Sequence, residues 1–173
     1  MIPLRVVTIN DEHPDLSRRE MHRVCRASHR AIGVKWAVDL LPEHFGQGAG
    51  SRFGYEPRTH AWNKRKAALQ RQGKAVGGYG DDLVFSGRLR DQVLLTARFN
   101  IDAYPSRVTI RMSGPAYFTM RPRGKHTRRI AQEILAMNGR HERLLGDAGE
   151  RGFEQELRKV RQERRLRKVT TQG

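Results

Sequence analysis

Seven histidines and one cysteine are the side chains of this sequence best suited to metal binding or nucleophilic chemistry. His22 and His29 are seven residues apart and could share a helix face, but no acid or cysteine completes a metal set at that spacing. The sequence contains no CxxC, HExxH or His-x-Glu pattern. The remaining histidines are scattered along the chain, at His13, His44, His60, His126 and His141. We therefore expect neither a zinc site nor a metal-hydrolase site.

The other groups able to do chemistry are also isolated. Cys25 falls on the apolar face of a predicted helix, a position typical of a buried structural thiol rather than a nucleophile. Asp81, Asp82 and Asp91 form the mid-chain acidic cluster, yet no third carboxylate or lysine is placed to complete a metal-dependent nuclease. The glycine-rich run 46–54 lacks the Gly-Lys-Ser/Thr ending of a phosphate loop and follows a helix rather than a strand. The sequence thus predicts no enzyme and no cofactor.

Positive charge is the dominant feature of the composition. The 173 residues carry a formal net charge of +16, and the basic residues concentrate in 52–74 and 158–168. Such a surface attracts polyanions and binds nucleic acid without sequence preference at low salt. Of the 34 basic residues 27 are arginines, which suits phosphate or carboxylate recognition but is equally expected from a GC-rich genome.

The number of cysteines and the distribution of apolar residues restrict the protein class. A single cysteine excludes a disulfide-stapled secreted fold. No apolar run approaches the roughly 18 residues of a membrane span, and Arg5 followed by acidic residues does not fit a signal peptide. We expect a soluble protein made in the cytoplasm, with no membrane partner.

Basic residues interleaved with aromatic ones mark the candidate binding surface. Trp62 precedes the run Asn63 to Lys66, a composition typical of nucleic-acid surfaces, although a solvated helix anchored by Trp62 would show the same pattern. No sequence-reading nucleic-acid motif is present, so any such contact would be electrostatic. The candidate contacts to DNA or to an acidic partner are Lys64, Arg65, Lys66, Arg158, Lys159, Arg161, Arg164, Arg165, Arg167 and Lys168.

A long amphipathic helix near the N-terminus is the clearest element that could position these groups. Ser17 and Glu20 have the spacing of a capping box, which predicts the helix start. The apolar face then repeats every three to four residues until the helix ends near Leu41-Pro42 or runs on to Phe45. This face comprises Met21, Cys25, Ser28, Ile32, Trp36 and Leu40.

The middle of the chain alternates short elements with glycine-rich segments. Residues 2–9 read as a strand, 46–57 as a loop, and Thr59 as the cap of a short basic helix that Gly73 ends. Residues 83–85 read as a short buried strand or a turn.

A hairpin and a second long helix follow. Val93–Asp102 and Arg107–Met112 alternate apolar and polar residues around a turn at 103–106, and 116–120 is a candidate further strand. Residues 130–137 fit either strand or helix. Asn138 is the expected N-cap of the C-terminal helix, whose apolar side comprises Leu145, Ala148, Gly152, Phe153, Leu157 and Val160.

These elements predict an α+β fold, in which a long N-terminal helix packs on a small antiparallel sheet and a basic helix lies at the C-terminus. We expect one domain over 1–157, followed by a basic helix end and tail over 158–173. Gly146, Gly149 and Gly152 each cost the C-terminal helix about 1 kcal/mol relative to alanine, so packing must hold it.

An ordered set of motifs follows the long helix: Phe45-Gly46, the run Arg52 to Arg58 (RFGYEPR), a lysine-bearing helix, and Leu83 to Arg90 (LVFSGRLR). This set resembles the virion-morphogenesis or tail-completion (neck) proteins of tailed bacteriophages. Ser86 stands where these proteins often have threonine. The resemblance spans roughly residues 15–112 and does not extend clearly into the C-terminal third. Its motif residues are Arg52, Phe53, Gly54, Tyr55, Pro57, Arg58, Ser86, Gly87, Arg88 and Leu89.

The resemblance implies a structural virion subunit at the head–tail junction. Such a subunit would assemble as a ring, of six- or twelve-fold symmetry, between the portal or adaptor and the tail proteins, with genome DNA passing through the lumen. The motif residues would form an assembly loop, and the Ser86-Gly87 turn would set up the segment after it. The alternative that the charge favours is a non-sequence-specific nucleic-acid-binding accessory protein.

Overall fold

The computed structural model describes residues 2–4, 15–73, 88–91, 93–94, 99–112 and 130–170. Side chains are described throughout these ranges except at 2–4, 88–89, 130–131 and 168–170. The chain forms two compact units, one built from 1–36, 100–111 and 142–173 and the other from 37–99 and 112–141.

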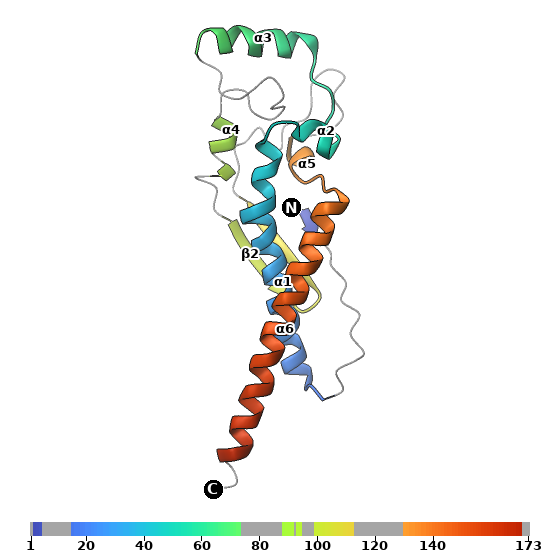
Figure 1. Ribbon diagram of the computed structural model, residues 1–173, viewed down its shortest axis with the longest axis vertical. Coiled ribbons are helices and arrows are strands. Elements are labelled where there is room, and N and C mark those ends of the chain that lie inside the picture. Colours follow the sequence, from blue (N-terminus) through green and yellow to red (C-terminus); the bar gives the residue numbers. More distant parts are fainter. Residues whose placement is uncertain are drawn as a thin grey trace. The chain divides into compact units, whose positions relative to one another are not determined.

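The first unit is organised around helix α1, Arg18–Lys35 (Figure 1). Its start is fixed by the predicted capping box: the Glu20 backbone N–H donates to the Ser17 hydroxyl, and the Glu20 carboxylate accepts from the Ser17 N–H. Cys25, Ser28 and Ile32 of the predicted face are buried, and so is Val24, which the prediction did not include. The helical run then continues through the π-helical turn η1, Trp36–Leu40, and the 3-10 helix η2, Leu41–Phe45, so the helical prediction out to Phe45 is confirmed.

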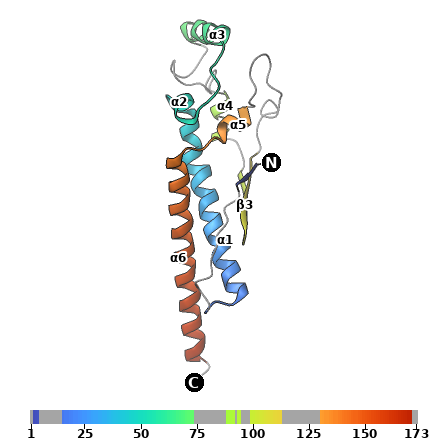
Figure 2. The same ribbon diagram turned by 90° about the vertical axis from the view of Figure 1, so that its right-hand side faces the viewer.

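Helix α6, Gly139–Thr170, is the second long element, and its residues 142–170 run beside α1 in the first unit (Figure 2). Asn138 caps it as predicted, because the His141 N–H donates to the Asn138 Oδ1 at 2.9 Å. Most of the predicted apolar side is buried, including Leu145, Leu157 and Val160.

Two glycines of α6 allow a close approach to α1. A Cβ on Gly152 would lie 2.8 Å from the Ala31 Cβ and 3.1 Å from the Ala27 carbonyl oxygen, and one on Gly149 would lie 2.9 Å from the Ile32 Cδ1. The Ser28 hydroxyl donates to the Gly149 carbonyl at 2.8 Å, which adds a buried hydrogen bond at this contact. The glycines that weaken α6 as a helix therefore make its packing possible.

The contact between α6 and α1 predicts that a glycine-to-alanine substitution in α6 changes the free energy of unfolding in opposite directions at two positions. Gly152→Ala should lower the free energy of unfolding by about 1–3 kcal/mol, since the new methyl group meets backbone and cannot be accommodated by a rotamer change. Gly146→Ala is the matched control: no atom lies within 4 Å of its Cβ position, so the better helix propensity of alanine should stabilise by up to about 1 kcal/mol. Denaturant titrations of both variants check the expectation, and equal effects would contradict it.

Within the described ranges, the sheet of the first unit has three strands in the order β1-β3-β2. Strand β1, Ile2–Leu4, pairs antiparallel with β3, Arg107–Met112, in the register Ile2 opposite Ile110. Strand β2 is Phe99–Tyr104, so the predicted hairpin is confirmed with its turn at Pro105-Ser106. α1 lies beside this sheet (Figure 2). The two elements pack closely at Gly33, where a Cβ would lie 2.5 Å from the Ile101 side chain and 3.1 Å from that of Val108.

The second unit contains the shorter helices. The predicted basic helix is α3, His60–Arg71, whose start is capped by the Thr59 hydroxyl accepting from the Trp62 N–H. Gly73 follows it with a φ of 67°. Helix α4 spans Arg88–Asp91 and α5 spans Ile130–Ile134, so the undecided segment 130–137 begins as a helix.

The structure corrects two sequence-based predictions. The predicted loop 46–57 contains the short helix α2, Ala49–Phe53, which begins and ends at glycines with positive φ, Gly48 and Gly54. Because glycine reaches this region without strain, the glycines that indicated a loop instead delimit a helix. Val93 and Leu94 are helical rather than extended, so the first hairpin strand begins at Phe99.

The predicted α+β class, with its long N-terminal helix and antiparallel sheet, is confirmed. Residues 158–170 continue α6 without a break. The assignment of 1–157 to a single domain stays a prediction. The expected strands at 5–9 and 116–120 and the expected element at 83–85 lie outside the described residues.

Candidate functional site

The motif run Arg52 to Arg58 is anchored in the core of the second unit by its two aromatic residues. Phe53 stacks on His44 with ring centroids 4.0 Å apart, and lies 4.9 Å from the ring of His141. The Tyr55 hydroxyl lies 2.6 Å from the His44 Nδ1 in a buried hydrogen bond. All four rings are buried, so the aromatic residues of the motif hold it in place rather than being exposed.

Burial and charge suppress the protonation of His44 inside this aromatic cluster of His44, Phe53, Tyr55 and His141. Burial, together with the nearby His141, lowers the pKa of His44 from 6.5 to about 4. Among the described residues, the second ring nitrogen of His44, Nε2, has no hydrogen-bond partner, and neither has the Nδ1 of His141. A proton added to His44 would therefore enter a site without an acceptor in the described part of the chain.

Glu43 forms the polar edge of the cluster. Its carboxylate accepts from Arg140 at 2.7 Å and lies 3.3 Å from the His141 Nε2. Burial raises the pKa of Glu43, but the hydrogen bonds from Arg140 and His141 outweigh it and hold the pKa below its usual value. Through these contacts the first residues of α6 attach to η2.

The last residue of the motif run is fixed by a buried ion pair. Arg58 Nη2 donates to the Glu133 carboxylate at 2.6 Å, and the other oxygen of Glu133 accepts from the Glu56 backbone N–H at 3.2 Å. The side chain of Glu133 is 1% exposed and that of Arg58 is 14% exposed. Glu133 on α5 therefore ties the segment between α2 and α3 to the core.

The remaining motif residues are exposed or undescribed. Arg52, Gly54 and Pro57 are exposed, and Arg52 donates to the Gln47 carbonyl at 3.1 Å. Arg88 and Leu89 begin α4, while Ser86 and Gly87 lie outside the described residues. The structure thus brings 52–58 together around one core, and the assembly role of the ten motif residues stays a prediction.

The candidate basic contacts on α3 divide into exposed and buried side chains. Lys64 and Arg65 are exposed, whereas Lys66 is 4% exposed with its Nζ 5.4 Å from the centre of the Trp62 ring. Arg58 approaches the same ring at 6.0 Å. Trp62 is partly buried beside these two cations, and its part in nucleic-acid binding stays a prediction.

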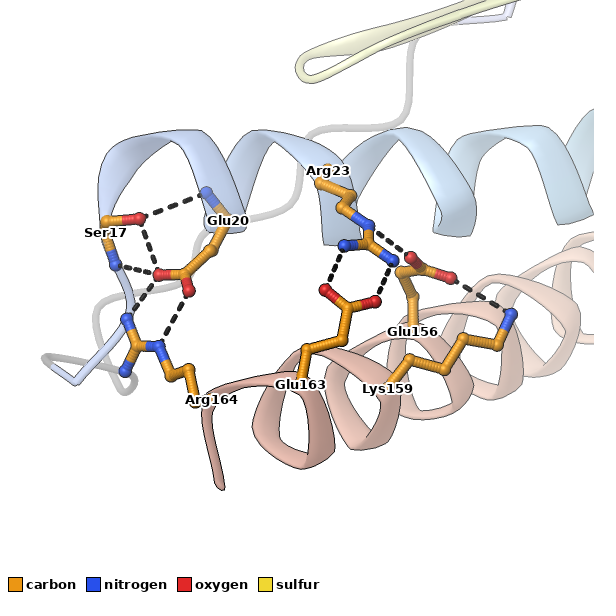
Figure 3. Close-up of polar contacts among 7 residues, drawn as sticks. All are labelled: Ser17, Glu20, Arg23, Glu156, Lys159, Glu163 and Arg164. Atoms are coloured by element: carbon orange, nitrogen blue, oxygen red, sulfur yellow. Dashed lines mark hydrogen bonds and ion pairs between the residues drawn. The ribbon is translucent and has the colours of Figure 1, made fainter. Parts of the chain in front are cut away.

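Much of the charge at the basic end of α6 is used within the chain (Figure 3). Arg164 donates to Glu20 at 2.7 Å, and this contact together with Ser17 lowers the pKa of Glu20 to about 2. Arg161 lies 4.0 Å from Asp15. Within α6, Arg158 pairs with Glu154 and Lys159 pairs with Glu156. Arg165 and Arg167 are exposed, and the side chain of Lys168 is not described.

Sequence reasoning did not single out Glu133, nor His44 and His141 as partners of the motif. The signal for Glu133 was weak, because a glutamate within an ambiguous segment gives no indication of burial. His141 follows the N-cap Asn138 by three residues, which places it in the first turn of α6 but does not reveal its neighbours.

In the described part of the chain, no three or more His, Cys, Asp or Glu residues are grouped so as to hold a metal ion. None of the helices in the ranges described above combines the length and apolarity that a bilayer crossing requires. No family model, curated protein or solved structure matches this chain.

Proposed function

We propose that this chain is a structural subunit of the head–tail junction of a tailed bacteriophage, assembling as a ring that joins the portal or adaptor to the tail. The observation that supports this proposal most is the anchoring of the motif run. Phe53 and Tyr55 are held by the aromatic cluster, and Arg58 is held by Glu133. The exposed residues between these anchors are therefore presented in a defined geometry, as a specific subunit contact requires.

Helix α3 extends this candidate interface. It follows directly from the anchored run and exposes Lys64 and Arg65 beside the partly buried Trp62. In the sheet order β1-β3-β2, β2 is an outer strand whose partner among the described strands is β3 alone. A neighbouring subunit could extend the sheet there by adding a strand. The anchored loop with α3 in the second unit, and the sheet edge in the first unit, are each suited to a repeated subunit contact in a ring.

The proposal predicts a closed oligomer in solution. Size-exclusion chromatography with light scattering, followed by negative-stain microscopy, should give the mass and outline of a ring, and the subunit should be present in purified virions. A chain that stays monomeric at every concentration and is absent from virions would contradict the proposal.

A charge reversal on α3 tests where the ring contact lies. Lys64→Glu/Arg65→Glu should move the mass distribution towards smaller species without changing the far-UV circular dichroism, since both side chains are exposed. Arg151→Glu/Arg165→Glu, on exposed positions of α6, is a control with the same change of charge. Equal losses in the two variants would assign the effect to total charge and not to α3.

A further inference from the structure

We infer that a groove on α1, with Arg19 and Arg26 as its contacts, binds the phosphate backbone of nucleic acid. The groove has a volume of about 430 Å³, and its lining among the described residues is Arg19, His22, Arg23 and Arg26. These positions are spaced i, i+3, i+4 and i+7, which places them along one stripe of the helix. Three of the four side chains are arginines, whose planar fork matches phosphate oxygens.

The charge of Arg23 is already satisfied by α6. Its guanidinium donates to Glu156 at 2.6 Å and to both oxygens of Glu163 at 2.8 and 2.9 Å (Figure 3). The Nζ of Lys159 lies 3.3 Å from the second oxygen of Glu156. Arg23 and Lys159 together offset the two carboxylates, so Arg23 forms a neutralised, fixed part of the groove and contributes little to attracting an anion.

Arg19 and Arg26 carry the excess charge. Both are exposed, and within the described residues neither has a carboxylate partner. This distinguishes them from Arg158, Lys159, Arg161 and Arg164 at the basic end of α6, each of which faces an acid of the chain. The sequence places the highest density of charge on 158–168, but the structure leaves the charge on α1 available.

The arginines that lack an acidic partner among the described residues form a row along α1, which suits a repeating polyanion. Arg30 continues the row, is exposed and likewise lacks an acidic partner among the described residues. At a rise of 1.5 Å per residue, Arg19 and Arg26 are about 10 Å apart along the helix, and Arg26 and Arg30 about 6 Å apart. DNA carries its phosphates at short, regular intervals, about 3.4 Å along the duplex axis for each strand, so a row of arginines meets phosphates at any position along the duplex. A protein partner would instead need carboxylates placed to match this row.

The inference takes from the proposed function only that DNA passes the assembled subunit. The two fail separately, because binding to a short DNA duplex can be measured on the chain whether or not rings form. A chain that forms rings but does not bind DNA would overturn this inference and leave the proposed function standing. Groove-dependent DNA binding by a strict monomer absent from virions would overturn the proposed function and leave this inference.

The test compares two double variants that remove the same charge. Arg19→Gln/Arg26→Gln acts on the groove, and Arg158→Gln/Arg161→Gln acts on arginines that are paired within the chain. Affinity for a fluorescently labelled duplex is measured by anisotropy over a series of salt concentrations. Log K falls as log salt rises, and in the groove variant this slope should be less steep by about 2, because two phosphate contacts are lost. The control should keep a slope close to that of the unmodified chain.

Two further measurements complete the experiment. Arg19→Lys/Arg26→Lys keeps the charge, so it should keep the salt slope. Its affinity should fall only because lysine lacks the bidentate guanidinium of arginine. Poly-glutamate competing for the labelled duplex tests an acidic protein partner. Equal losses in the two glutamine variants, an unchanged slope in the groove variant, or groove-dependent binding of poly-glutamate in place of duplex would each overturn the inference.

Discussion

Replacing Glu133 by alanine is expected to lower the free energy of unfolding by about 3–5 kcal/mol, the usual cost of removing one partner of a buried ion pair. The carboxylate is 1% exposed and accepts from Arg58 at 2.6 Å and from the Glu56 N–H at 3.2 Å. Its removal leaves a guanidinium that is 14% exposed without its counter-charge and a backbone donor without its acceptor. Denaturant titration followed by tryptophan fluorescence measures the loss, since Trp62 lies 6.0 Å from Arg58.

Two further variants distinguish the loss of the Glu133 charge from the loss of its hydrogen bond and side-chain volume. Glu133→Gln keeps an oxygen for the Glu56 N–H, so it should cost less than the alanine variant. Arg58→Met/Glu133→Met removes both charges and fills the space, and should recover much of the stability that Glu133→Ala loses. If Glu133→Ala were no more harmful than Glu154→Ala, at an exposed position of α6, the assigned role of the buried pair would be wrong.

The elements that were predictable from sequence are those determined by local patterns. The capping box at Ser17 and Glu20, the Thr59 and Asn138 caps, and the apolar periodicity of α1 and α6 depend on neighbours within a few residues. Glycine was harder to interpret, because the same residue breaks a helix, ends one, or allows two helices to touch. Only the close approach of α6 to Ala27 and Ala31 shows which of these roles Gly152 has.

The candidate site required tertiary information. One ring partner of Phe53, His141, and the ion-pair partner of Arg58, Glu133, lie tens of residues away, and no spacing rule connects them. The sequence also does not show which basic side chains remain able to bind an anion. A count of charges treats Arg164 and Arg26 as equal, but Arg164 is bound to Glu20 while Arg26 lines an open groove. Pairing within the chain, rather than charge density, determines which surface can attract an anion.

Acidification from pH 7 to pH 4.5 is expected to destabilise the chain by about 2–3 kcal/mol through His44 alone. Burial and the neighbouring His141 lower its pKa in the fold to about 4, against 6.5 for the ordinary group. Between these two pH values His44 binds a proton in the unfolded chain but not in the folded chain. The contribution of His44 to the free energy of unfolding is therefore complete above pH 6.5 and is lost as the pH falls towards 4. Among the described residues, the titratable or charged groups that act on the pKa of His44 are His141, Glu43 and Arg52, and of these three Glu43 alone favours its protonation.

The pH window distinguishes His44 from the carboxylates. The pKa values of Glu20 and Glu43 are lowered, so the stability they contribute is lost mainly below pH 4.5. His44→Phe keeps a ring to stack on Phe53 and should flatten the pH dependence between 6.5 and 4.5, even if the variant is less stable at pH 7. His60→Gln, at an exposed position of α3, should leave the dependence unchanged. Denaturant titrations across this range check both variants, and an equally steep fall in His44→Phe would show that another group titrates in the fold.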